Sequence, residues 1–108
     1  MNHEWAAGLF EGEGYIRQPG VKRSAHEVRI KMTDYDILQR MHQHYGGNLF
    51  LETKAQAHHK QAWVWSLTTK TLVKGFLLDI LPFLGLRRTY LALNALDAID
   101  KCLVLPRL

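Results

Sequence analysis

The stretch Trp5-Ala-Ala-Gly-Leu-Phe-Glu-Gly-Glu-Gly-Tyr-Ile16 decides the fold of this 108-residue chain. Asn2, just before it, is a favourable N-cap, and small or apolar residues recur within it at helical spacing. These features predict a helix from Asn2 to Glu11, which Gly12 and Gly14 then end.

Two features of this helix depart from ordinary helix composition. Gly8 and Gly12 share one face, although each glycine costs up to ~1 kcal/mol in a helix interior relative to alanine. Glycine permits the close approach of another backbone, so with Ala7 this pair predicts tight packing against a partner helix. Glu11 and Glu13 lie at the C-terminal end, where the helix dipole disfavours an acid by ~0.3–1 kcal/mol unless a cation is near. A functional carboxylate and plain surface acids at a frayed helix end both fit this pattern.

Outward from this stretch, hydrophobic periodicity predicts four short strands and three more helices. Residues 26–33 alternate strictly, with Val28, Ile30 and Met32 on one side and polar or basic residues on the other. The expected strands cover residues 15–20, 26–33, 48–54 and 61–67, and the expected helices cover residues 34–45, 69–84 and 86–103.

This element order, α-β-β-α-β-β-α-α, predicts a single α+β domain over residues 1–108. Its four-stranded, mostly antiparallel sheet would have helices on one face and a polar, basic face left open. A β-ribbon of this kind fits the DNA major groove.

The net charge of +4 is concentrated in the middle of the sequence. Residues 14–31 hold five Lys or Arg and one acid, and residues 53–74 hold four Lys and no acid. A face that meets a polyanion and a merely solvated basic surface both fit this distribution.

Composition argues against a membrane or secreted protein. The longest apolar run, residues 76–86, is interrupted by Asp79, Pro82 and Gly85, and falls short of the ~20 residues that span a bilayer. The first residues lack the pattern of a secretory signal. The single Cys102 excludes an internal disulfide and fits a reducing compartment. We therefore expect an intracellular protein with no membrane partner.

Residues 6–14, Ala-Ala-Gly-Leu-Phe-Glu-Gly-Glu-Gly, resemble the LAGLIDADG motif position for position in character. The stretches Trp63-Val-Trp-Ser66 and Leu81-Pro-Phe-Leu-Gly-Leu-Arg-Arg88 also resemble the homing endonucleases that carry this motif, as does the element order over nearly the whole chain. The resemblance implies a saddle-shaped sheet that binds a long duplex DNA site. It also implies site-specific hydrolysis of both strands across the minor groove, which leaves 3′ overhangs and serves intron or intein mobility. The setting that the resemblance implies is a bacterial or phage-infected cytoplasm or an organelle.

The resemblance implies that Glu13 is the catalytic metal ligand, with help from the backbone carbonyl of Gly12. Lys70 lies near where the family often has a lysine close to the active site, although a solvent-exposed lysine at a helix start fits equally. Mg²⁺ is usually held by one or two protein carboxylates, and this chain has one motif. We therefore expect a homodimer on a near-palindromic site, with two or more Mg²⁺ ions shared at the dimer axis. The expected dimer contacts are Ala7, Gly8, Glu11 and Gly12, with Glu11 also structural at the helix junction.

Strand alternation and loop charge together predict the DNA contacts. On the open face these are Tyr15, Arg17, Arg29, Lys31, Thr33, Asn48, Phe50 and Glu52, joined by Ala62, Val64 and Ser66. From the loops we expect Lys22, Arg23, Lys54, His58, His59, Lys60 and Gln61.

Several alternatives stay open. His42, His44, His58, His59 and Cys102 could suggest zinc, but their spacing is not that of a zinc finger, and we interpret His42 and His44 as helix-surface residues. A catalytically inactive LAGLIDADG regulator or splicing maturase would share the motif. A dimerising nucleic-acid binder outside the family would use the glycines only for packing. In each case we expect no small-molecule substrate.

Overall fold

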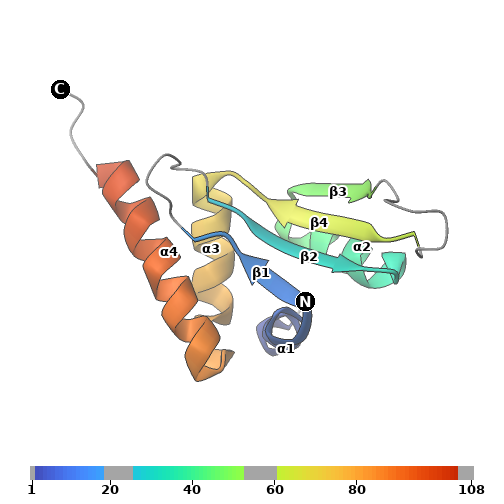
Figure 1. The fold of residues 1–108 in the computed structure, drawn as a ribbon, viewed down its shortest axis with the longest axis horizontal. Coiled ribbons are helices and arrows are strands. Elements are labelled where there is room, and N and C mark those ends of the chain that lie inside the picture. The colour runs from blue at the N-terminus through green and yellow to red at the C-terminus, as the bar shows by residue number, and fades with distance from the viewer. Residues whose placement is uncertain (1, 19–25, 53–60, 105–108) are drawn as a thin grey trace.

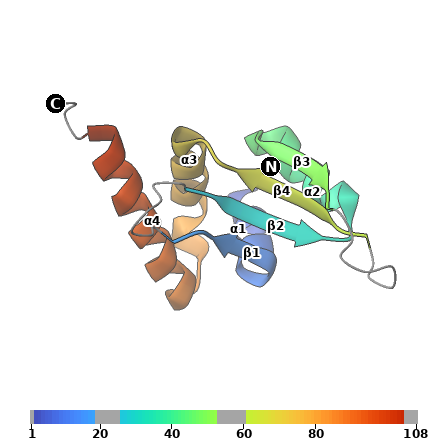
Figure 2. The ribbon, with the colours of Figure 1, turned by 45° about the horizontal axis from the view of Figure 1, so that its top comes forward.

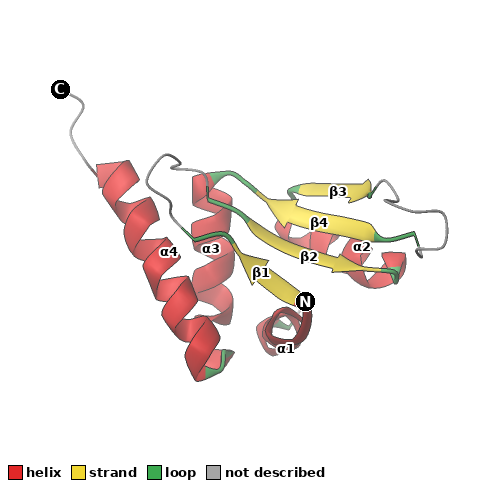
Figure 3. Cartoon of the chain, viewed as in Figure 1, coloured by secondary structure: helices red, strands yellow, loops and turns green. Residues whose placement is uncertain are grey.

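The computed structural model describes residues 2–18, 26–52 and 61–104, and side chains only as far as Lys101 in the last helix. The elements follow the predicted order (Figures 1 and 3). They are α1 (His3–Glu13), β1 (Gly14–Ile16), β2 (Val28–Met32), α2 (Tyr35–Tyr45), β3 (Asn48–Leu51), β4 (Trp63–Leu67), α3 (Lys70–Ile80), the 3₁₀ turn η1 (Leu81–Phe83) and α4 (Leu86–Val104). Among the described residues, no helix combines the length and apolar character needed to cross a membrane.

The strands form one four-stranded sheet in the order β1-β2-β4-β3, and every neighbouring pair is antiparallel. Figure 2 shows the two central strands, β2 and β4, flanked by the shorter edge strands. Helices α1 and α2 contact the sheet, α3 packs against α1, and α4 contacts α3 and β1. The predicted α+β architecture is confirmed, with one face of the sheet covered by helices and the other left open.

The core lies between the sheet and the helices. Trp65 on β4 and Phe10 on α1 both meet the ring of Phe76 on α3 edge-to-face, each with ring centroids 5.3 Å apart. All three rings are buried, so they fix the position of α1 on the sheet. The indole of Trp65 also donates a hydrogen bond to the Gly46 carbonyl at 3.0 Å.

Several element ends differ from the prediction. Among the described residues each strand is shorter than expected, and two helices end elsewhere. Helix α1 runs through Glu13, so Gly12 lies inside the helix and does not end it. The helix expected over residues 69–84 ends at Ile80 and gives way to η1, which contains Pro82. The predicted stop of α2 is confirmed, because Gly46 and Gly47 both adopt positive φ angles.

Candidate functional site

The open face of the sheet carries rows of side chains that cross all or most of the strands. The strand register places one row across β1, β2, β4 and β3, formed by Tyr15, Arg29, Ser66 and Asn48. The next row is formed by Lys31, Val64 and Phe50. The guanidinium of Arg29 lies 5.2 Å from the centre of the Tyr15 ring. An aromatic neighbour thus holds a cation on this face.

The outer residues of these rows are open to solvent. Tyr15 and Phe50 are each 47% exposed, and Lys31, Thr33 and Asn48 are exposed as well. Glu52 is not a free contact, because its carboxylate lies 2.5 Å from the Lys31 ammonium and its backbone carbonyl accepts a hydrogen bond from the Gln61 amide. Similarly, Arg17 pairs with Glu27 at 3.6 Å.

The predicted contacts from β4 and from the residue just before it are wrong for this chain. Ala62, Val64 and Ser66 are buried, with exposures of 9%, 2% and 3%. In the strand register Ser66 lies between Arg29 and Asn48, and Val64 lies between Lys31 and Phe50, so each has a larger side chain on both sides. The expected loop contacts Lys22, Arg23, Lys54, His58, His59 and Lys60 lie outside the described residues.

The predicted metal ligand Glu13 is the last residue of α1, and its side chain is exposed. No hydrogen bond or ion pair within the described part of the chain engages its carboxylate. Gly8 and Gly12 are also exposed, and a Cβ added to either would meet nothing within 4 Å. The glycine face of α1 therefore makes no close approach to its own chain, although glycine there lowers helix stability.

Ala7 does not belong to an interface, and that prediction is wrong. It has 0% exposure and packs in the core of this chain beside Phe10, so no surface is left for a partner. The small side chain instead serves the packing of α1 against its own sheet and helices.

Arg88, at the start of α4, clamps the C-terminal end of α1. Its guanidinium donates to the carbonyl oxygens of Phe10 and Gly14, each at 3.1 Å, and its Nε lies 3.1 Å from a carboxylate oxygen of Glu11. The other carboxylate oxygen of Glu11 accepts a hydrogen bond from the backbone N–H of Gly85. The structural role predicted for Glu11 at the helix junction is thereby confirmed, while its place at a dimer interface stays a prediction.

Arg88 also resolves the electrostatic anomaly of α1. A helix C-terminus favours a nearby cation, and Arg88 supplies it from a residue 78 positions away from Phe10. The two carbonyls that Arg88 holds lie on either side of Glu13 in the sequence, so the clamp fixes the backbone that carries this carboxylate. Sequence reasoning missed Arg88, because nothing in the spacing of the Leu81–Arg88 stretch indicates which of its residues turns back to α1.

Lys70 begins α3 and is half-buried. Its charge acts on His26, a buried residue just before β2 that sequence reasoning did not single out. Burial lowers the pKa of His26 below its ordinary value, and the charge of Lys70 lowers it further. Within the described chain, no ion pair or hydrogen bond joins Lys70 to Glu13, and a joint catalytic role of these two residues stays a prediction.

The chemistry around Glu13 fits half of a magnesium site. Nowhere in the described residues do three or more His, Cys, Asp or Glu side chains gather in a way that could hold a metal ion. A single unpartnered carboxylate beside the Gly12 carbonyl still matches what Mg²⁺ takes from a protein, since this ion keeps several waters and uses one or two carboxylates. A complete site needs a second carboxylate from another copy or oxygen ligands from a substrate.

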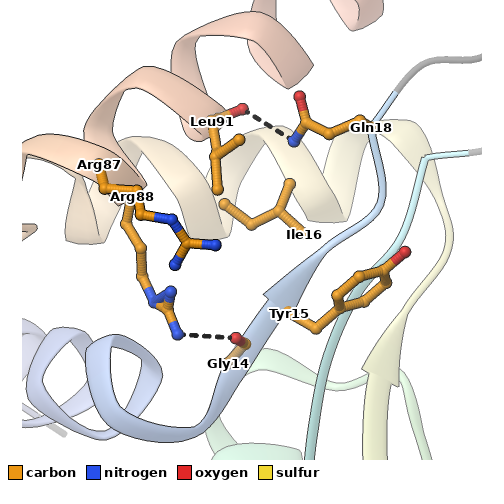
Figure 4. Close-up of a pocket in the computed structure, with 7 residues that line it drawn as sticks. All are labelled: Gly14, Tyr15, Ile16, Gln18, Arg87, Arg88 and Leu91. Atoms are coloured by element: carbon orange, nitrogen blue, oxygen red, sulfur yellow. Dashed lines mark hydrogen bonds between the residues drawn. The ribbon is translucent and has the colours of Figure 1, made fainter.

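Beside this site lies a hollow of about 280 Å³ between β1 and the first turn of α4 (Figure 4). Its lining consists of Gly14, Tyr15, Ile16, Gln18, Arg87, Arg88 and Leu91. The amide of Gln18 donates to the Leu91 carbonyl at 3.4 Å and closes one side. The hollow begins one residue after Glu13 and reaches the open face at Tyr15.

Comparison with known proteins gives matches in structure but not in sequence. No protein-family model matches the chain, and no curated protein matches it. Its structure is similar to that of the homing endonuclease I-CvuI in complex with its target in the presence of Ca, with a TM-score of 0.74 and 19% identity over 92% of this chain. It is also similar to the archaeal intron-encoded homing endonuclease I-Vdi141I complexed with DNA (TM-score 0.72, 15% identity, 94% of this chain) and to the homing endonuclease I-TnaI (TM-score 0.70, 12% identity, 94% of this chain).

The chain spans 66% of the length of the I-CvuI chain and 68% of that of I-Vdi141I. At these low identities the likeness is one of fold, and it extends over almost every described element. Together with the motif in residues 6–14, it establishes that this chain has the fold of the LAGLIDADG homing endonucleases.

Proposed function

We propose that this chain is one subunit of a homodimeric, Mg²⁺-dependent, site-specific endonuclease that cleaves duplex DNA. The observation that carries the proposal is the exposed, unpartnered carboxylate of Glu13 at the end of α1, beside an open sheet face with cationic and polar side chains. The similar structures of I-CvuI and I-Vdi141I are both complexes with DNA, which supports the same kind of partner here.

Side chains on the open face support the proposed DNA binding. Arg29, held over Tyr15, offers a guanidinium that can reach guanine edges in the major groove. Phe50 and Asn48 on the edge strand β3 extend the exposed surface away from the candidate metal site. The Lys31–Glu52 pair is exposed, so it would exchange its partner for a phosphate at low free-energy cost.

Two copies of the chain would complete the active site. The exposed glycines at positions 8 and 12 leave α1 smooth on one side, which allows the α1 helices of two subunits to approach closely. A two-fold axis along this contact would place one Glu13 from each subunit near the same stretch of DNA. Such symmetry favours a palindromic or nearly palindromic target.

In the assembled dimer each residue has a distinct task. Mg²⁺, when bound, would supply a more acidic water and neutralise charge on the phosphate. Glu13 and the Gly12 carbonyl would provide its protein ligands, and Arg88 would keep the end of α1 in place. Lys70 would add positive charge toward the phosphate of a bound strand. Hydrolysis of both strands would leave 3′ overhangs.

A selection on a random-sequence duplex library tests this proposal. With Mg²⁺ we expect cleavage of a small set of related, nearly palindromic sites, and with Ca²⁺ we expect binding of the same sites without cleavage. Specific binding with no cleavage in Mg²⁺ would instead indicate a regulator or a maturase. Absence of any duplex binding in either metal would contradict the proposed function.

A further inference from the structure

The open face of the sheet carries an exposed acidic side chain where binding of a polyanion favours cations. Glu52 directly follows β3, and alternation from Asn48 and Phe50 places its side chain on the same open face. Its carboxylate lies 2.5 Å from the ammonium of Lys31. A carboxylate close to a phosphate backbone is repelled, so a bound duplex has to offer Glu52 a favourable partner.

The backbone of Glu52 is held in place although the residue lies beyond the end of β3. Its N–H donates to the carbonyl of Ala62 at 2.8 Å, and its own carbonyl accepts a hydrogen bond from the side-chain amide of Gln61. Both partners lie just before β4, the strand that neighbours β3 (Figure 2). The carboxylate therefore starts from a fixed backbone position, and only its side-chain torsions remain free to choose a partner.

A second acid on this face is tied more firmly to its own chain. Glu27 lies at the opposite end of β2, where it pairs with Arg17 at 3.6 Å and accepts a hydrogen bond from the Arg17 backbone N–H. Its side chain is 16% exposed, against 40% for Glu52 and 56% for Lys31. Water competes for the more exposed pair, which contributes little free energy. The contact between Lys31 and Glu52 can therefore open when DNA arrives.

The four bases differ in what they offer a carboxylate in the major groove. Once Lys31 turns to a phosphate, the carboxylate of Glu52 can only accept hydrogen bonds. Cytosine presents the N4 amino group, a donor, and adenine presents the N6 amino group beside the acceptor N7. Guanine presents two acceptors, N7 and O6, and thymine presents the acceptor O4. A carboxylate at this place favours an amino group and is repelled by a base carbonyl.

We propose that Glu52 selects cytosine at one position of each half-site. The inference rests on the proposed function and assigns a specificity-determining residue to it. The amino group of cytosine replaces the ammonium of Lys31 as the donor to Glu52, whereas a base that offers only acceptors leaves the carboxylate without a donor. Glu52 thus acts by rejecting wrong bases as well as by accepting one. The expected order of affinity at this position is cytosine, then adenine, then guanine and thymine.

The test selects bound duplexes from a random-sequence library with Ca²⁺, using the wild type, Glu52→Gln and Glu52→Ala. The wild type should select cytosine at a position where Glu52→Gln selects adenine, because a glutamine amide can both accept from N6 and donate to N7. Glu52→Ala should lose the preference there and keep it at the other positions. Between two duplexes that differ only at this position, the wild type should bind cytosine about 5-fold or more tighter than thymine.

Glu27→Gln is the matched control, since it makes the same chemical change on the same face at the other end of β2. It should keep the preference for cytosine. Unchanged selection in both Glu52 variants would overturn the inference and leave the proposed function intact. A loss of the cytosine preference in Glu27→Gln as well would also overturn it, because the effect would not belong to Glu52. A wild-type protein that binds duplexes without any base preference would instead contradict the proposed function itself.

Discussion

Replacing Gly8 by alanine should have opposite effects on the folding of one chain and on the association of two. Within one chain, the added methyl group would meet nothing within 4 Å, so only the intrinsic helix preference acts. Alanine in a helix interior is favoured over glycine by ~0.8–1.0 kcal/mol. Urea unfolding at low protein concentration should therefore show a gain of about 1 kcal/mol.

The same methyl group should weaken the proposed dimer. Overpacking a tight contact costs typically ~1–3 kcal/mol, and a two-fold interface contains the substitution twice. A loss of at least ~2 kcal/mol raises the dimer dissociation constant about 30-fold, which sedimentation velocity over a concentration series resolves.

Gly75 supplies the matched control for this experiment. It lies in α3, is exposed, and a Cβ added there would also meet nothing within 4 Å. Gly75→Ala should give the same gain in unfolding free energy and leave association unchanged. If Gly8→Ala and Gly75→Ala associate equally well, the glycine face of α1 is not the contact between subunits.

Three further predictions concern stability and ionisation. Glu11→Gln should lower the free energy of unfolding by ~1–3 kcal/mol, because it leaves the half-buried Arg88 without its carboxylate; an unchanged urea midpoint would contradict the clamp. Burial lowers the pKa of His26 in the folded chain. Below pH ~6.5 the unfolded chain therefore takes up the proton first, and the free energy of unfolding falls until the pH reaches the folded-state pKa. The stability of His26→Gln should therefore fall less between pH 8 and about 5 than that of the wild type, and parallel curves would refute this. Burial, and then the charge of Asp79, raises the pKa of Tyr45 to about 12. Tyr45→Phe should therefore remove the last tyrosine step of an ultraviolet titration. If that step persists in the variant, the highest tyrosine pKa does not belong to Tyr45.

The fold followed from periodic patterns that do not depend on distant contacts. Val28 and Ile30 are buried as the alternation in β2 requires, and Leu38 and Met41 are buried at helical spacing in α2. The glycine pair after α2 ended it as predicted, since both residues adopt backbone angles that other residues rarely take. Local propensity and tertiary packing agree in these segments.

The errors arose where the answer depends on which segments become neighbours. Val64 alternates like an exposed strand residue, yet it is buried. It lies on β4, a central strand of the sheet, and no local sequence pattern indicates which strand becomes central. Ala7 looked like part of a smooth interface, but α1 is rotated so that Ala7 and Phe10 face the core. Arg88 was missed because its contacts with α1 cross more than seventy residues of sequence.

The candidate metal ligand could be located in advance, and its surroundings could not. The motif placed Glu13 at the end of the first helix, where the structure also has it. The clamp from Glu11 to Gly85 and Arg88, and the hollow beside it, depend on how η1 and α4 return to α1. The local sequence thus places the carboxylate of Glu13, whereas distant segments of the chain provide the contacts that hold its end of α1.

The most direct test of the central claim compares Glu13→Gln with Glu4→Gln in single-turnover cleavage of the selected duplex. Both variants make the same chemical change on exposed residues of α1, one at the candidate metal site and one in the first turn. Glu13→Gln should lose several kcal/mol of rate acceleration, about 100-fold or more, while its binding of the duplex with Ca²⁺ persists. Glu4→Gln should cut at the wild-type rate. Cleavage by Glu13→Gln at the wild-type rate would contradict the assignment of this carboxylate to the reaction.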